Sequence, residues 1–297
     1  MNGIINVKKE KGFTSHDVVA KLRGILRMKK IGHTGTLDPD ATGVLPVCVG
    51  KATKVCDLLT DKDKTYVAEV KLGITTDTLD LTGEILAEQE VSVTEEDIRK
   101  SLEAFRGEIQ QIPPMYSAIK INGKKLYELA RQGKEVERKP RTVTIQELIL
   151  RDVALDKQEF TIEVTCSKGT YIRTLCQDIG EVLGCGAAMK SLVRTRVGRF
   201  TIEKAKTLAE IEAQVKSAEA EDFWIPIEEV FDGYRRCDVE TKAMNFLRNG
   251  NLVKPSLCSL KTPQAGEQVR MYGDDGAFYA IYRYEEKDKM FHIVKMF

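Results

Sequence analysis

The segment from Gly32 to Gly43 constrains the fold more than any other stretch of this chain. It reads Gly-His-Thr-Gly-Thr-Leu-Asp-Pro-Asp-Ala-Thr-Gly, and it cannot form a regular helix, because Pro39 blocks one and three glycines weaken one. It contains neither G-x-G-x-x-G nor Gly-Lys-Ser/Thr, which argues against a dinucleotide site or a P-loop. Pro39 also restricts the backbone of Asp38 to extended conformations. We therefore expect a tight loop that presents the Asp38 carboxylate, although an Asp-Pro pair alone is usually only a turn.

Length and cysteine usage are those of a globular protein that keeps its thiols reduced. The chain has 297 residues, which favours about two domains. Its longest mostly apolar run, near Gly43–Gly50, is far shorter than the roughly 18 residues that span a bilayer, so we expect no membrane segment. Seven cysteines without a C-x-x-C pair argue against a disulfide framework or a structural zinc site. Met1–Lys11 has no apolar stretch behind its lysines, so we expect no secretory signal and a cytoplasmic location.

Basic residues are concentrated in three segments, although the net charge is only +1. Residues 1–60 hold 10 Lys/Arg and 5 Asp/Glu, residues 120–141 hold 8 and 3, and residues 168–199 hold 6 and 2. A nearly neutral protein with such segregation can still bind a polyanion such as a nucleic acid. The alternative is a solvated surface whose counter-charges fold beside it, and charge alone leaves both open.

The apolar periodicity predicts an α+β protein built around a mixed sheet. Thr14 and Asp17 form a capping-box-like helix start, and Gly32 supplies a stop for that helix. Further helices are expected at 94–105 and at 172–183, the second ending at Gly184. Strands are expected at Lys64–Leu72, Thr142–Leu150 and Phe160–Cys166. From about residue 233 a short helix and several hairpins predict a small β-rich appendage, so we place a domain boundary near Asp232.

Five ordered blocks of this sequence resemble the TruB-type family of bacterial tRNA pseudouridine-55 synthases. The first is Gly32–Gly43 continuing into Val44–Lys54, and the others follow in family order up to about residue 200. They are Lys64-Thr-Tyr66, Thr76-Asp-Thr-Leu-Asp80, Pro113–Gly123 and Gly169-Thr-Tyr-Ile-Arg173. Several blocks in order, one of them a twelve-residue loop, are far more specific than a single short motif.

The resemblance implies both a fold and an organisation. Residues 1–232 would form the catalytic domain, an α+β pseudouridine synthase fold with a mixed, largely antiparallel sheet flanked by helices. Residues 233–297 would form a small C-terminal β-rich, PUA-like, RNA-binding domain. No metal or organic cofactor is implied.

The resemblance also implies a reaction, in which uridine 55 in the T-loop of tRNA is flipped out and converted to pseudouridine. Asp38 matches the catalytic aspartate, the nucleophile, which attacks C1′ or assists formation of a glycal. Tyr66 matches a tyrosine that stacks on the base, and Arg173 matches the arginine that pairs with the aspartate and orients it.

Three further residues match substrate-binding positions of the family. His33 matches a histidine that fills the space the uridine leaves, Leu192 matches a leucine of the uracil pocket, and Asp80 matches a further acid near the site. The basic segments 120–141 and 168–199 would then hold tRNA phosphates.

The residues alone allow other interpretations of each position. Arg173 could bind a phosphate or lie on the surface. Tyr66 and Leu192 could be ordinary core residues, and Asp80 could be a surface-loop carboxylate.

Three functions compete at this point. The first is a stand-alone tRNA-modifying enzyme that acts as a monomer, without guide RNA, protein partner or membrane. The second is a non-catalytic RNA-binding or tRNA-folding protein. The third is a synthase that acts within a guide-RNA particle. A glycosidase is poorly supported, because no pair of catalytic carboxylates is evident.

Overall fold

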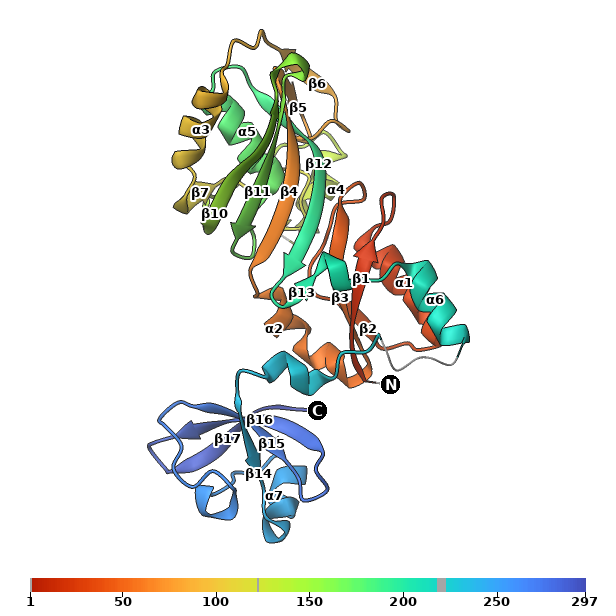
Figure 1. The fold of residues 1–297 in the computed structure, drawn as a ribbon, viewed down its shortest axis with the longest axis vertical. Helices are drawn as coiled ribbons and strands as arrows, with labels where there is room; N and C mark the ends of the chain where they lie inside the picture. Colours follow the sequence, from red (N-terminus) through yellow and green to blue (C-terminus); the bar gives the residue numbers. More distant parts are fainter. Residues whose placement is uncertain (1, 122, 218–222) are drawn as a thin grey trace.

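The computed structural model describes residues 2–121, 123–217 and 223–297, and one mixed sheet dominates it (Figure 1). The nine strands of this sheet are β1 (Gly3–Lys9), β2 (Ile31–His33), β3 (Thr42–Val49), β4 (Lys64–Leu72), β7 (Gly107–Gln111), β10 (Arg141–Ala154), β11 (Glu159–Cys166), β12 (Ala187–Val197) and β13 (Phe200–Thr201). Its main order is β1-β3-β12-β4-β11-β10-β7, and β2 and β13 pair with β3 and β12. Every pairing is antiparallel except that of β3 with β12.

Helices cover the sheet at two places. In Figure 1, α3 and α5 lie against one end of the sheet, and α1 and α6 lie side by side next to β1. The helices are α1 (Ser15–Leu26), α2 (Cys56–Thr60), α3 (Glu95–Glu103), α4 (Leu126–Ala130), α5 (Ile172–Val182), α6 (Leu208–Lys216) and α7 (Met244–Arg248). Three of them begin with a complete capping box, formed by Thr14 and Asp17, by Thr94 and Asp97, and by Thr207 and Glu210.

The predicted elements are present, and two of their boundaries are wrong. The first helix ends at Leu26 and not at Gly32. The next residue, Arg27, takes a left-handed conformation (φ 51°), and its N–H bonds back to the carbonyls of the last turn. Gly32 lies instead in β2. The strand expected at Thr142–Leu150 continues to Ala154, because β11 pairs along its whole length across two bulges.

The chain beyond residue 233 forms a second, smaller sheet, which Figure 1 shows below the large one. It is ordered β14 (Arg235–Asp238), β15 (Gln268–Tyr272), β16 (Phe278–Glu285), β17 (Met290–Met296). Two short hairpins complete the strands, β5 (Ile74–Thr76) with β6 (Ile85–Glu88) and β8 (Lys120–Ile121) with β9 (Lys124–Lys125). The small sheet is joined to the large one by an apolar cluster that includes Ile4, Phe231 and Ile281.

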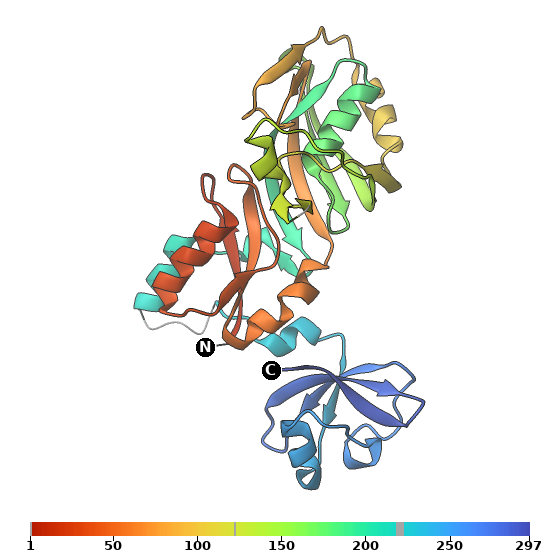
Figure 2. The same cartoon turned by 180° about the vertical axis from the view of Figure 1, so that it is seen from behind.

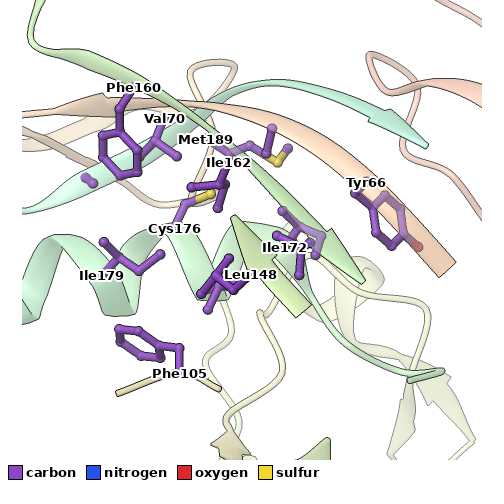
Figure 3. Packing of buried hydrophobic residues seen from close by; sticks show 14 of the residues in the cluster. Tyr66, Val70, Phe105, Leu148, Phe160, Ile162, Ile172, Cys176, Ile179 and Met189 are labelled. Atoms are coloured by element: carbon purple, nitrogen blue, oxygen red, sulfur yellow. The ribbon is translucent and has the colours of Figure 1, made fainter. Parts of the chain in front are cut away.

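The main core lies between α3, α5 and the sheet (Figure 3). The face of β4 that carries Tyr66, Ala68, Val70 and Leu72 is buried there, as its alternation predicts. Figure 3 shows Phe160 and Tyr66 toward opposite ends of this cluster, with Ile172 and Ile179 of α5 on its helical side. The cluster therefore reaches from the packed interior to the end of β4 at which Tyr66 lies.

One acid on α5 has an unfavourable environment, and this leads to a first testable prediction. Burial, and then repulsion from Glu181, raise the pKa of Asp178 to about 6. Since its pKa in the unfolded chain is near 3.8, the folded state binds this proton more tightly, and the contribution of Asp178 to stability falls as pH rises from about 4 to 6. Asp178→Asn should therefore stabilise the protein by about 1–2 kcal/mol at pH 7.5, with a smaller gain at pH 5. Urea unfolding at both pH values measures this, and an equal gain at both would contradict it.

Among the described residues, no helix combines the length and the apolarity that crossing a membrane requires.

Candidate active site

The loop at residues 34–41 connects β2 to β3 and carries Asp38. Its backbone is anchored from several sides. Ser15 Oγ accepts a hydrogen bond from the N–H of Leu37 at 2.9 Å, and Lys9 Nζ donates to the carbonyls of Pro39 at 3.0 Å and Ala41 at 2.6 Å. Leu37 and Ala41 are themselves buried in the main core. The loop is thus held by its flanks, while 42% of the Asp38 side chain stays exposed.

Arg173, in the first turn of α5, meets Asp38 from the other side. Its side chain is only 7% exposed, and its Nε lies 3.1 Å from Oδ2 of Asp38. The other nitrogens donate to two backbone carbonyls, Nη1 to Thr78 at 2.9 Å and Nη2 to Tyr116 at 2.7 Å. A planar guanidinium can join several segments in this way, and here it fixes the direction from which it meets the carboxylate.

Asp80 is the second acid beside this arginine. Its Oδ2 lies 3.6 Å from Nη1 of Arg173. Its other oxygen accepts hydrogen bonds from Thr78 Oγ1 at 2.8 Å and from both the N–H and the hydroxyl of Thr82. The carboxylate is 15% exposed and is saturated on one side, so its free oxygen faces the guanidinium. This oxygen of Asp80 therefore faces Arg173 rather than solvent.

Tyr66 and Leu192 form an apolar wall in the same region. Tyr66 is 7% exposed and Leu192 is 8% exposed, and both belong to the core cluster that contains Leu37 of the loop. Burial raises the pKa of the Tyr66 phenol, and the nearby Arg194 opposes this rise. The tyrosine is a neutral hydroxyl at physiological pH. Figure 3 shows its ring at the end of β4, turned away from the middle of the cluster.

His33 lies apart from the ionic group, at the start of the loop. Its Nδ1 accepts a hydrogen bond from the N–H of Gly35 at 3.3 Å, and its ring makes an edge contact with His16 at 5.2 Å between centroids. Burial lowers the pKa of His33, which favours a neutral, flat ring. The structure thus brings Asp38, Arg173 and Asp80 together, and it places His33 outside this group.

Comparison with known proteins identifies the family. Residues 23–172 match the model described as TruB family pseudouridylate synthase (N terminal domain). Residues 173–232 match that of the tRNA pseudouridylate synthase B C-terminal domain. The chain belongs to the TruB family of tRNA pseudouridine synthases. It is accordingly an enzyme, an isomerase, and the family expected from the sequence blocks is confirmed.

Curated relatives and solved structures agree with this membership. The chain is 55% identical to tRNA pseudouridine synthase B of Lachnoclostridium phytofermentans, with 100% of each chain covered, and 50% identical to that of Alkaliphilus oremlandii, with 85% and 83% covered. Among solved structures it resembles a chain of an H/ACA RNP bound to a substrate RNA containing 2′-deoxyuridine, at TM-score 0.73 and 25% identity. It also resembles a chain of a Cbf5-Nop10-Gar1 complex, at TM-score 0.73 and 28% identity. Each match covers 99% of this chain and 84% of the other, and the expected fold class is confirmed.

Three buried cations around the TruB-family loop were not singled out from the sequence. Lys9 and Arg194 are each 1% exposed, and Lys64 is 7% exposed. Burial lowers the pKa of Lys9 and that of Lys64 to about 8. A signal was present, because Lys9 falls on the same strand face as the buried Ile5 and Val7. Arg194 shares the face of Leu192 in the same way.

The basic segments differ in what they offer to a polyanion. In 168–199, Arg173 and Arg194 are buried, so neither side chain is among the exposed cations of this segment. Lys168, Lys190 and Arg199 are exposed, and each forms an ion pair with a neighbouring carboxylate. In 120–141 most basic side chains are exposed, and within the described part of the chain only Arg138 forms a salt bridge. The exposed ones are Lys120, Lys124, Arg131, Lys134, Lys139 and Arg141.

No group of three or more His, Cys, Asp or Glu side chains within residues 2–121, 123–217 and 223–297 has the arrangement of a metal site.

Proposed function

We propose that this TruB-family enzyme converts uridine 55 in the T-loop of tRNA to pseudouridine, with Asp38 as its nucleophile. The observation that carries the proposal is the contact between Asp38 and Arg173. It joins a partly exposed carboxylate, on a loop anchored from both flanks, to a guanidinium that is itself fixed by two carbonyls. A carboxylate held in this way is suited to covalent catalysis, which divides a difficult substitution into two easier steps.

In the proposed reaction, the bond between N1 of uracil and C1′ of the ribose breaks. Asp38 attacks C1′ or assists formation of a glycal. The base then turns and C5 bonds to C1′. Any bond between Asp38 and C1′ breaks in this step, the C5 proton passes to solvent, and N1 takes up a proton. Arg173 fixes the direction of the carboxylate, and Asp80 orients Arg173. Tyr66 and Leu192, which are both buried in the core cluster, would supply an apolar wall for the base.

Access to the target requires that the uridine leave the folded T-loop, at a cost of about a few kcal/mol. We propose that His33 fills the space that the uridine leaves in the T-loop of the tRNA. A neutral imidazole ring that is held at Nδ1 by Gly35 can stack as a flat surrogate for a base. The position of His33 outside the group of Asp38, Arg173 and Asp80 is consistent with a role in RNA binding rather than in bond cleavage.

We propose that the exposed basic segment 120–141 binds tRNA, and that the domain at 233–297 is a second RNA-binding unit. Tyr116, just before the basic segment, is tied to Arg173 through its carbonyl, so the segment starts beside the active site. Figure 2 shows it in yellow-green, next to the tips of the N-terminal loops in red. Phosphate contacts made there would position the T-arm without reading its sequence.

We further propose that the enzyme acts as a monomer in the cytoplasm, without guide RNA or partner protein. All seven cysteines are free thiols, as in a reducing compartment. The structural neighbours belong to an H/ACA RNP and to a Cbf5-Nop10-Gar1 complex, so action without partners has to be tested directly.

Tritium release from tRNA labelled at uridine C5 tests the proposal. The purified protein alone should release tritium from a single position of a transcribed tRNA. The matched control is the same transcript with cytidine at position 55, which should release none. Release from both transcripts would refute the position, and release only after addition of guide RNA or a second protein would refute stand-alone action. Tight binding without release would favour an RNA-binding protein.

A further inference from the structure

Arg194 of β12 is the largest side chain that is fully buried in the described structure. Its nitrogens donate to three backbone carbonyls, from Nε to Val44 at 2.7 Å, from Nη1 to Thr36 at 3.4 Å and from Nη2 to Gly35 at 3.4 Å, and its side chain also interacts with the phenol of Tyr66. Within residues 2–121, 123–217 and 223–297, no carboxylate lies at salt-bridge distance from it. A buried guanidinium without an anion is costly, so its contacts to the loop and to Tyr66 are the features that can account for its presence.

The carbonyls that Arg194 contacts lie on both sides of Asp38. Gly35 and Thr36 precede this residue, and Val44 follows it at the beginning of β3. Lys9 holds two further carbonyls of the loop, those of Pro39 and Ala41. A loop without a regular ladder must satisfy its buried carbonyls individually, and here two buried cations donate to four carbonyls of the loop and to that of Val44 in β3. The positions of these cations therefore set the path of the loop.

Local packing leaves the loop little freedom to move toward β12. Gly43 pairs in parallel with Arg194, and the two backbones lie so close that there is no room for a side chain at position 43. At Gly35, a Cβ would lie 3.8 Å from Nη1 of Arg194 and 3.9 Å from Cε of Lys64. The guanidinium thus lies against Gly35 and hydrogen-bonds to carbonyls on both sides of Asp38.

We propose that Arg194 is a positioning residue for catalysis, which fixes the Asp38 carboxylate by clamping both ends of its loop. This inference rests on the proposed role of Asp38. The geometry requires a planar fork, because one ammonium group cannot reach Val44 and Gly35 in the directions that Nε and Nη2 use. Arg173 sets the direction of the carboxylate from the substrate side, and Arg194 sets the position of the backbone that carries it.

The test compares Arg194→Lys with Arg196→Lys, the same substitution two residues further along the same strand. Arg196 donates to Thr65 Oγ1 and to the carbonyl of Gly198, and to no atom of the loop. For Arg194→Lys we expect kcat to fall about 30- to 100-fold, because a displacement of about 1 Å can cost this much. The KM for tRNA should stay within about threefold, since no substrate contact is lost. Amide hydrogen exchange of residues 35–44, measured on the protein without RNA, should become faster. Arg196→Lys should leave kcat and exchange unchanged.

Several outcomes would overturn the proposal. They are wild-type kcat and exchange in Arg194→Lys, a rise in KM alone, or an equal effect of Arg196→Lys. If Arg194→Lys does not fold, Arg194→Gln, which can still donate to one carbonyl, takes its place, and failure of both to fold would make the residue structural and reject a positioning role. Exchange is independent of turnover. A wild-type protein that makes no pseudouridine would therefore refute the proposed function, while the exchange comparison would still decide whether Arg194 holds the loop.

Discussion

Replacement of Asp38 by asparagine is expected to lower turnover by about 10⁴-fold or more, as removal of a nucleophile does in other covalent enzymes. The amide has nearly the same shape but lacks the charge that must attack or assist at C1′. Binding of tRNA should stay within about threefold of wild type. Arg173 keeps its bonds to Thr78 and Tyr116, and the loop keeps its anchors at Lys9 and Ser15. Single-turnover tritium release and filter binding measure the two quantities separately.

The chain offers a matched control for this change on the same loop. Asp40 lies two residues further along, its side chain is 53% exposed, and it lies 3.9 Å from Lys11 rather than beside Arg173. Asp40→Asn removes the same charge and should change turnover only a few-fold. If Asp40→Asn were as inactive as Asp38→Asn, loss of loop charge would explain both variants. If Asp38→Asn lost tRNA binding together with turnover, Asp38 would be structural.

Local features of this molecule could be predicted because they depend on neighbouring residues. The capping boxes at Thr14 and Thr94 need partners only three residues away, and the buried face of β4 follows from strict alternation. The loop around Asp38 could be predicted from Pro39 and its glycines. Pairing of Asp38 with Arg173 was expected only from the family resemblance, because the two residues come from distant segments.

The groups that hold the Asp38 loop and Arg173 in place could not be predicted in the same way, because their positions depend on long-range pairing. Only the parallel pairing of β3 with β12 brings Arg194 beside Gly43, and no local sequence pattern predicts this pairing. Charged residues are normally exposed, so a count of charges does not separate Lys9 and Arg194 from the exposed basic residues. The carbonyl of Tyr116, which holds Arg173, carries no side-chain signal at all. The sequence therefore points to the reacting groups more clearly than to what fixes them in place.

Replacement of Arg173 by lysine is expected to lower kcat by about 10²- to 10³-fold with little change in the KM for tRNA. Lysine keeps the charge, but one ammonium cannot reach Asp38, Asp80 and the two carbonyls together. The carboxylate of Asp38 would then lose its fixed direction, an effect felt mainly in the transition state. Steady-state kinetics of tritium release measure kcat and KM.

Two further variants separate the roles of this arginine. Lys168→Met removes an exposed cation from the turn before α5, where Lys168 pairs with Asp61, and should leave kcat unchanged. Asp80→Asn should lower kcat less than Arg173→Lys, and the double variant should be no worse than Arg173→Lys, because Asp80 acts through the arginine. Additive effects would mean that Asp80 acts independently of Arg173. A raised KM with unchanged kcat in Arg173→Lys would instead make this residue a phosphate ligand, which is the alternative that its position at a helix start left open. Its burial and its 3.1 Å contact with Asp38 argue for the catalytic role.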